Sequence, residues 1–450
     1  MHAIINGRIV LNDKILDGCV LLFDKKITGI VSRETFDTAW QQEKRWRGKS
    51  LTLTDADGAY VSPGFINLHI HGCVGADTMD AGEDTLAVMS RFLVQTGVTA
   101  FLPTTMTCKM PVVYNALERV REAMTVITRR RDEKHESLLT GRAPVTGAET
   151  PEAVPVRNLR EDSCTERSGL PGDKVVKGKN LLPGAKVLGA HLEGPFISSA
   201  YKGAQKEEYI IPADFTYIRD FADVVKVVVL APETLEQTEK VKDFIVQCKA
   251  RNIIVSLGHS AADYDTARRA IEAGVSHVTH LCNAMTGMHH RNPGLVGAAL
   301  DTEVTCELIA DNLHVHPAVQ RLVYRSKGVE GIELVTDSMR ACGLPDGIFE
   351  LGGQTVYVKN GAARLADGTI AGSVVTMNRA LKNFRENAGA TVPEVVRMVT
   401  ENQAQELGLF EKIGSLSPGA AADITIFDEV FTILHTFVDG REVYKNLGFR

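Results

Sequence analysis

The sequence of 450 residues has no excess of positive charge, since 50 Lys and Arg face 56 Asp and Glu, a formal net charge of -6. Nucleic-acid-binding proteins usually carry a basic surplus, so this balance argues against a nucleic-acid partner. The sequence also lacks any apolar run of about 18 residues, and its start, MHAIINGRIV, lacks the basic and apolar regions of a signal peptide. We therefore expect a cytoplasmic protein with no membrane association.

The cysteines form no pattern either. Eight are scattered along the chain without a CxxC pair: Cys19, Cys73, Cys108, Cys164, Cys248, Cys282, Cys306 and Cys342. A disulfide framework needs denser spacing, so this distribution predicts reduced thiols and no disulfides. With 44% hydrophobic and 24% charged residues, the chain has enough apolar material for a large globular core.

The two ends of the chain resemble each other in pattern. Residues 2–62 alternate short β-rich runs with turn signals such as Asn6-Gly7 and Asp57-Gly58, and no helical period competes with them. Similar runs return near the end, in ADITIFD and ILHTFVDGREVY. We predict that 1–62 and 411–450 form one discontinuous small β domain, a β-sandwich built from both termini. Two unrelated terminal sheets are the alternative.

Between these ends, residues 63–410 alternate β-rich runs with helical stretches. Eight runs occur: FINLHIH, VTAFLPT, VLGAHLEG, VKVVVLAP, IIVSLGH, HVTHLC, VTCELIAD and IELVTDS. Helices are expected near 85–96, 112–128, 233–251, 263–273 and 317–326. This alternation indicates an α/β fold with a parallel sheet, and the count of eight favours a closed (β/α)8 TIM-type barrel over an open doubly wound sheet.

One stretch breaks the alternation. Residues 129–186 contain no Phe, Trp or Tyr and are rich in charge, Gly and Pro. Such a segment buries too little apolar surface to fold alone. We therefore predict a surface insertion at about 129–186, within the barrel domain.

Polar side chains occur where several of the eight runs end. His69 and His71 close the first run, and the strand period of two places both on one face. Four more polar residues hold equivalent places on later runs: Glu193, His259, His280 and Asp337. The C-terminal ends of barrel strands meet on the face that carries active sites. Taken singly, each histidine could be a core residue and each carboxylate a turn residue, but together they predict one cluster.

Imidazole and carboxylate groups without a thiolate suit a divalent zinc, iron, cobalt or manganese ion with an open position for water. A bound cation of this kind lowers the pKa of water to about 7. Asp337 is then the candidate general acid/base, since proton transfer requires a carboxylate within hydrogen-bond reach. The sequence thus predicts a metal-dependent hydrolase.

Several motifs resemble the amidohydrolase superfamily, and within it the deacetylases of N-acetylglucosamine 6-phosphate: PGFINLHIHG, GAHLEGPFIS with KGAQ, VSLGHS, THLCNAM with HHRNPG, IADNLHVHP, LVTDSM and IAGS. The resemblance covers nearly all of the chain outside 129–186. It implies the barrel with its small β domain, and hydrolysis of the acetamido group of this amino-sugar phosphate to glucosamine 6-phosphate and acetate. It also implies a homodimer, in which an arginine reaches across the interface.

The resemblance also implies roles for individual residues. Glu193, His259 and His280 resemble the ligands of the main metal, and His69 and His71 imply a second ion with Glu193 bridging. Asp337 resembles the catalytic acid/base, and His314 the histidine near the substrate carbonyl or sugar. Further expected substrate contacts are Ala204, Asn283, Ala284, Arg291, Asp311, Ile370, Ala371 and Gly372, with Arg291 as the phosphate ligand. Gln205 departs from the family, which often has histidine after KGA.

Two other interpretations remain open. The chain could be an amidohydrolase that acts on a different N-acyl amino sugar or on a cyclic amide. It could also be a scaffold that keeps the barrel as a non-catalytic binding module. The absence of a lysine at the position of Glu193 argues against the subgroup in which a carbamylated lysine bridges two metals.

Overall fold

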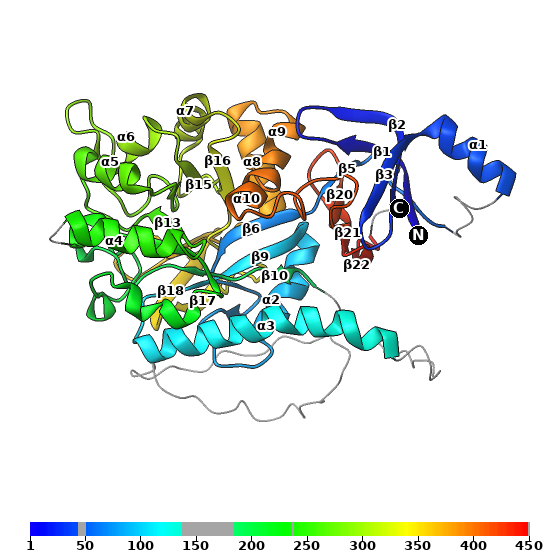
Figure 1. Ribbon diagram of the computed structural model, residues 1–450. Helices are drawn as coiled ribbons and strands as arrows, with labels where there is room; N and C mark the ends of the chain where they lie inside the picture. Colours follow the sequence, from blue (N-terminus) through cyan, green and yellow to red (C-terminus); the bar gives the residue numbers. More distant parts are fainter. Residues whose placement is uncertain (44–50, 137–183, 236–237, 449–450) are drawn as a thin grey trace.

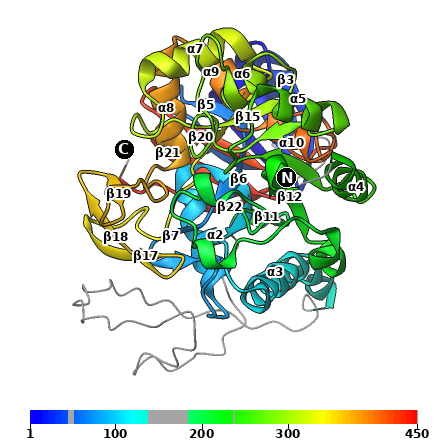
Figure 2. The same ribbon diagram turned by 90° about the vertical axis from the view of Figure 1, so that its left-hand side faces the viewer.

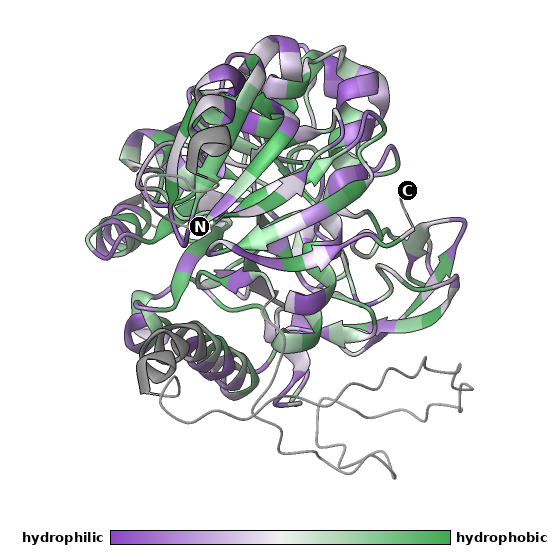
Figure 3. Ribbon diagram, turned by 90° about the vertical axis from the view of Figure 1, so that its right-hand side faces the viewer, coloured by the Kyte–Doolittle hydropathy of each residue, from purple (hydrophilic) through white to green (hydrophobic). Residues whose placement is uncertain are grey.

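The computed structural model describes residues 1–43, 51–136, 184–235 and 238–448. Figure 1 shows a barrel of strands and helices beside a smaller sheet that contains both ends of the chain. Apolar residues are concentrated along the central strands, while the surrounding helices carry most of the polar ones (Figure 3). No helix in these ranges is both long enough and apolar enough to cross a bilayer. The described cysteines are all free thiols; Cys164 lies outside the described residues.

The smaller sheet joins the two termini, as the sequence predicted. Strand β5 pairs antiparallel with β20 from the far end, with Ser62 opposite Thr425. The ring of Phe23 packs edge-on against Phe437 at 5.4 Å between centroids, so both termini share one apolar core. The sheet order is β22 (Arg441–Lys445), β21 (Ile433–Val438), β20 (Ile424–Phe427), β5 (Tyr60–Pro63), β1 (His2–Val10), β2 (Ile15–Phe23) and β3 (Ile27–Ser32), with β4 (Thr52–Asp55) beside β1.

The expectation that residues 2–62 contain no helix was wrong. Helix α1 (Arg33–Glu43) follows β3. The Ser32 hydroxyl accepts a hydrogen bond from the Thr35 amide at 3.2 Å, and Arg33 pairs with Asp37 one turn later. Among the described side chains of this helix, Phe36 is the one that is deeply buried. An amphipathic helix is recognised by repeated apolar positions, and α1 has almost no such repeat.

The central sheet is the predicted eight-stranded parallel barrel. Its last strand meets its first where the Asp337 amide donates to the His69 carbonyl at 2.9 Å and where Ile70 bridges Ser338. A short strand, β10 (Lys186–Val187), also pairs with β9. The barrel strands are β6 (Phe65–Ile70), β9 (Val98–Thr105), β11 (Ala190–Leu192), β12 (Val225–Leu230), β13 (Ile254–Leu257), β14 (His277–Val278), β15 (Thr305–Ile309) and β16 (Ile332–Val335).

Helices surround these strands, as Figure 2 shows. The Asp263 side chain caps the start of α5, and Thr391 and Glu394 form a capping box at α9. All five helical stretches expected from the sequence are present. The helices are α2 (Thr85–Leu93), α3 (Met110–Glu136), α4 (Thr238–Lys249), α5 (Tyr264–Ala273), α6 (Gly294–Leu300), α7 (Pro317–Lys327), α8 (Met377–Ala388), α9 (Val392–Arg397) and α10 (Glu401–Glu406), with short 3₁₀ turns at 94–96, 199–201, 207–209, 215–217, 219–221 and 232–234.

The sequence did not predict two small sheets, one in the connection after β16 and one in the connection after β6. A three-stranded antiparallel sheet, β17 (Gly347–Leu351), β18 (Gln354–Lys359) and β19 (Ala362–Arg364), lies between β16 and α8. A two-stranded ribbon, β7 (Gly72–Cys73) with β8 (Ala76–Asp77), follows β6. Both additions extend connections at the C-terminal ends of barrel strands, where substrate loops are expected.

The predicted insertion begins inside a helix. Helix α3 continues through Glu136, so the first eight residues of 129–186 are helical, and Lys186 already belongs to β10. The remainder of the segment, 137–183, lies outside the described residues.

A buried ion pair fastens the barrel to the smaller sheet. Lys186 on β10 contacts Asp423 at 2.8 Å, just before β20, and Asp439 at 2.7 Å, between β21 and β22. We expect Lys186→Ala to lower the free energy of unfolding by about 3–5 kcal/mol, because Asp423 would keep a buried, uncompensated charge. Urea unfolding measures this loss. Lys242→Ala is the control, since its pair with Glu239 is exposed, and a similar loss there would contradict the expectation.

Candidate metal centre and active site

The six polar residues predicted at strand ends come together. His69 lies in β6 and His71 directly after it, and Glu193 follows β11 by one residue. His259, His280 and Asp337 each follow their strand by two residues and share a left-handed backbone, with φ of 46°, 33° and 45°. Residues with a side chain rarely adopt this conformation, and it persists where the surrounding structure enforces it, often at functional sites.

The tightest group is a triad of Glu193, His259 and His280. Oε1 of Glu193 lies 3.1 Å from Nε2 of His259 and 3.0 Å from Nε2 of His280, and the two nitrogens are 3.0 Å apart. Nδ1 of His259 is 2.9 Å from the Tyr201 carbonyl, which can only accept, so Nδ1 carries the proton. In the neutral ring Nε2 therefore presents a lone pair to the carboxylate. Such a contact is repulsive unless a proton or a metal cation lies between the groups.

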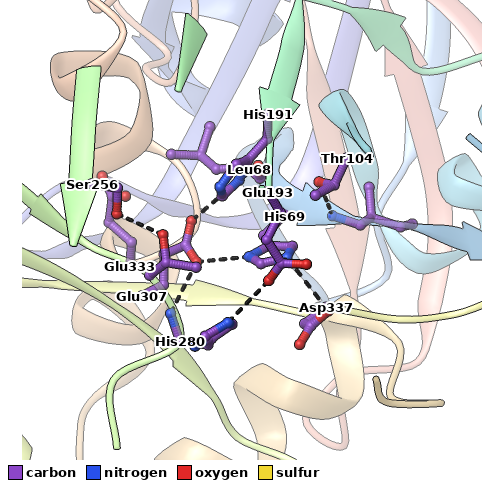
Figure 4. A network of polar contacts seen from close by, with 12 residues as sticks. Leu68, His69, Thr104, His191, Glu193, Ser256, His280, Glu307, Glu333 and Asp337 are labelled. Carbon is purple, nitrogen blue, oxygen red and sulfur yellow. Dashed lines mark hydrogen bonds and ion pairs between the residues drawn. The ribbon is translucent and has the colours of Figure 1, made fainter. Parts of the chain in front are cut away.

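A second group stands beside the triad. Nε2 of His71 is 3.1 Å from Oε2 of Glu193 and 3.2 Å from Oδ1 of Asp337, and Nε2 of His69 is 3.4 Å from the same Asp337 oxygen. Nε2 of His69 and Oδ1 of Asp337 are buried and have no hydrogen-bond partner among the described residues. Figure 4 shows His69, Glu193, His280 and Asp337 turned toward one another. Glu193 thus offers one oxygen to each group.

Both groups fit a divalent cation. Ligands about 2.0–2.1 Å from a tetrahedral zinc lie roughly 3.3 Å apart, close to the separations in the triad. His69, His71 and Asp337 likewise offer ligand atoms within 4.8 Å of one another. The donors are imidazole nitrogens and carboxylate oxygens without thiolate, a set that suits zinc, iron, cobalt or manganese.

The charges of the site reinforce this conclusion. Burial opposes the ionisation of Glu193, but His69, His71 and His259 outweigh it and hold the pKa of Glu193 well below its ordinary value. Burial likewise lowers the pKa of His71, but Glu193 and Asp337 outweigh it and raise that pKa well above the ordinary value. Despite burial, His69 and His71 lower the pKa of Asp337, which keeps it a carboxylate able to accept a proton.

Four of the expected substrate contacts line one pocket. Asp311 holds His314 through a 2.7 Å contact with Nδ1, which fixes the ring and leaves its other nitrogen available. The pocket is also lined by Ile370 and Gly372, and by Arg364, which the sequence analysis did not single out. A Cβ atom at Gly372 would lie 3.2 Å from the Asp337 carbonyl, so this loop passes directly over the candidate acid/base.

The other expected contacts are more dispersed. Ala284 lies near the triad, since a Cβ atom at Gly203 would be 3.4 Å from the His259 ring and 3.9 Å from the Ala284 side chain. Ala204, which follows Gly203, accepts a hydrogen bond from Gln354 at 2.5 Å. The side-chain amide of Asn283 donates to the His280 carbonyl in its own loop. The last two expected contacts also lie outside the pocket of His314: Ala371 is fully buried, and Arg291 is exposed.

Sequence reasoning missed two residues that touch the predicted ligands. Gln205, noted only as a departure, donates to Oε2 of Glu193 at 2.7 Å and accepts from the Thr107 amide at 2.7 Å. Glu307, on β15, lies 2.8 Å from Nδ1 of His69. A glutamate inside the apolar run TCELIAD was the available signal, since a lone charge in a barrel strand requires a buried partner. His191 lies in the interior, where burial and His69 lower its pKa to about 3.

An eight-stranded parallel barrel that gathers imidazoles and carboxylates at its strand ends defines the class of metal-dependent barrel hydrolases. The sequence profile of the amidohydrolase family matches residues 180–443, and the chain belongs to this family. An N-acetylglucosamine-6-phosphate deacetylase of Bacillus subtilis is 36% identical over 95% of this chain and 93% of its own. An N-acetylgalactosamine-6-phosphate deacetylase of Escherichia coli O157:H7 is 32% identical over 87% of this chain and 89% of its own.

Solved structures agree with these relatives. The crystal structure of N-acetylglucosamine-6-phosphate deacetylase from Pasteurella multocida superposes with a TM-score of 0.78 at 30% identity. The match covers 99% of this chain and 100% of that one. Hence the similarity includes the smaller sheet as well as the barrel.

Because a bound cation would compensate the close contacts within the triad, we expect metal removal to destabilise the fold. A ligand that binds only the folded state stabilises it by about 2.7 kcal/mol at 100 times its Kd. We expect a chelator to lower the Tm in scanning calorimetry and added Zn²⁺ or Mn²⁺ to restore it. His280→Ala should lose most of this difference. His435→Ala, whose ring pairs with Glu442 on the smaller sheet, should keep it. An unchanged Tm of the wild type after chelation would contradict the metal assignment.

Proposed function

We propose that this chain is a divalent-metal-dependent deacetylase. It hydrolyses N-acetyl-D-glucosamine 6-phosphate to D-glucosamine 6-phosphate and acetate. The observation that carries this proposal is the convergence of Glu193, His259 and His280 beside the buried Asp337 carboxylate. The names of the relatives support the substrate, because the chain matches a glucosamine-type deacetylase at 36% identity along nearly its full length.

The proposal includes two cation sites. Glu193, His259 and His280 would hold the main ion, and His69 and His71 would hold a second together with Glu193. When bound, a divalent cation supplies positive charge that favours deprotonation of water and polarises a carbonyl. Zinc, iron, cobalt and manganese all suit these ligands.

The protein's own groups move the proton. Asp337 accepts a proton from the attacking water as the new C–O bond forms, then returns it to the amide nitrogen as the C–N bond breaks. The remaining proton of the attacking water passes from the new carboxyl group to the released amine, so the products are acetate and the ammonium form of the amino sugar. His314 is oriented by Asp311 through Nδ1. Its Nε2 accepts a hydrogen bond from a sugar hydroxyl in the neutral ring, and donates one to the carbonyl oxygen when the ring carries both protons. Ala204 and the segment Ile370–Gly372 enclose the sugar.

The phosphate requires a fixed cation, because the protein is negatively charged overall. Arg291, with Asn283 and Ala284 on the same connection after β14, is the proposed phosphate site. Arg291 lies on an exposed segment of this connection, which supports a homodimer in which the guanidinium serves the neighbouring site. The free thiols of the described cysteines support a cytoplasmic location.

The role of Asp337 has a direct test. Asp337→Asn should lower kcat by roughly 100-fold or more, because general acid–base catalysis contributes about that much. The ion of the triad should remain, as metal analysis would show. Asp301→Asn, which changes an exposed carboxylate bonded to Tyr264, is the control and should leave kcat unchanged. A fully active Asp337→Asn would refute the assignment.

Acetate release separates the proposed function from its alternatives. The preparation should release acetate from N-acetylglucosamine 6-phosphate, lose this activity on chelation and regain it with metal. Greater kcat/KM for the 4-epimer would favour the galactosamine-type activity named for the Escherichia coli O157:H7 relative. Tight binding of metal without turnover of any N-acyl amino sugar or cyclic amide would indicate a non-catalytic scaffold.

The phosphate assignment predicts a loss confined to phosphorylated substrate. Hydrogen bonds to charged groups contribute about 1.5–3 kcal/mol, so Arg291→Ala should lower kcat/KM for the 6-phosphate by about 10–100-fold. Turnover of the unphosphorylated sugar should not change. Arg364→Ala is the comparison, because Arg364 lines the pocket of His314. If Arg364→Ala alone causes the loss, the phosphate lies in that pocket and the assignment to Arg291 is wrong.

A further inference from the structure

Glu307 lies in the barrel interior, beneath the predicted metal ligands. It is fully buried in the middle of β15. Its Oε2 lies 2.8 Å from Nδ1 of His69 and accepts the backbone N–H of His280 at 3.1 Å. Glu307 therefore touches one ligand of each proposed cation. No step of the proposed reaction uses it.

These contacts fix the proton on His69. A carboxylate oxygen that already accepts the His280 amide is oriented as an acceptor, so Nδ1 of His69 must donate to it. The opposite nitrogen, Nε2, then presents its lone pair toward Glu193 and Asp337, each at 3.4 Å. Without Glu307, the His69 ring could turn or carry its proton on Nε2, and either change would remove it as a ligand.

Glu307 could instead be a metal ligand with His69 and His191, since these three also offer atoms within 4.8 Å. Two contacts argue against this. Nδ1 of His191 lies 3.0 Å from the Leu68 carbonyl and must donate to it. Oε2 of Glu307 is engaged by two N–H groups, one from His69 and one from His280. The geometry is that of a hydrogen-bond acceptor.

We propose that Glu307 is a positioning residue that sets the affinity of the second divalent cation by holding His69 in its Nδ1-protonated form. This inference rests on the proposed function, because it assumes a second cation at His69 and His71. Carboxylate partners of metal-binding histidines typically affect metal affinity by about 10–100-fold.

The neighbouring strand provides a matched control. Glu333 stands opposite Glu307 in the β15–β16 register and is equally buried. It also pairs with a buried histidine, at 3.0 Å from Nε2 of His277. His277 is not among the predicted ligands, and its Nδ1 contacts Ser256. Substituting Glu333 thus removes a similar buried carboxylate without touching the metal centre.

The experiment is a titration of metal-free full-length protein with Co²⁺, followed by calorimetry and by visible absorption. The wild type should bind two ions per chain. In Glu307→Gln the weaker ion should bind about 10–100-fold less tightly, while the stronger ion keeps its affinity. Glu333→Gln should bind both ions as the wild type does. Thermal unfolding establishes that each variant is folded.

Each outcome decides between the two proposals. Two ions with wild-type affinities in folded Glu307→Gln would overturn the role of Glu307 and leave the proposed function intact, as would an equal loss in Glu333→Gln. A single ion per wild-type chain, with His69→Gln binding it unchanged, would overturn the second cation and the inference together.

A measurement on the wild type needs no folded Glu307 variant. In zinc-loaded protein with ¹⁵N-labelled histidine, His69 should show a hydrogen-bonded Nδ1 proton in the NMR spectrum, assigned by its disappearance in His69→Gln. Protonation at Nε2 instead would overturn the proposal.

Discussion

The Glu193 carboxylate is the group on which the site depends. One of its oxygens lies within 3.1 Å of the Nε2 atoms of His259 and His280, and the other faces His71 and the amide of Gln205. Anionic and lone-pair donors hold such positions only when a cation compensates them. The barrel makes this possible, because its parallel strands bring residues separated by up to 268 positions, from His69 to Asp337, to one edge.

The layer below the cluster explains how the ligands are kept in place. Most barrel interiors are filled with branched apolar side chains. Here the interior instead contains hydrogen-bonded polar pairs: Glu307 with His69, Glu333 with His277, Asn67 with Thr336, and Ser256 with Thr279. Figure 4 shows part of this network, with Glu307, Glu333 and Ser256 beside His69 and His280. These buried hydrogen bonds restrict the side chains, so the imidazoles need little reorganisation to bind a cation.

The sequence predicted those parts of the fold that depend on regular alternation. The eight apolar runs correctly predicted the eight barrel strands. The polar residues at the ends of these runs predicted the candidate metal cluster, because the period and length of a run indicate where its strand ends. Helix α1 was not predicted, because its described part buries little more than Phe36. The sheet β17–β19 was not predicted either, because its strands are partly exposed and lie within the connection between β16 and α8. The importance of Glu307 was not predicted, because it depends on a contact with His69 in β6, which is 238 residues away in the sequence.

Loop contacts were the least predictable part of the site, and Gln205 shows why. Its position after Gly203-Ala204 indicated only that it belongs to a substrate loop. In the structure its amide spans from the Thr107 backbone to Glu193, so the loop directly contacts the candidate central metal ligand. A carboxylate oxygen has two lone pairs, and Oε2 can accept from Gln205 while facing His71. The loop proposed to enclose the sugar is therefore hydrogen-bonded to the carboxylate proposed to bind the cation, so a shift of one would move the other.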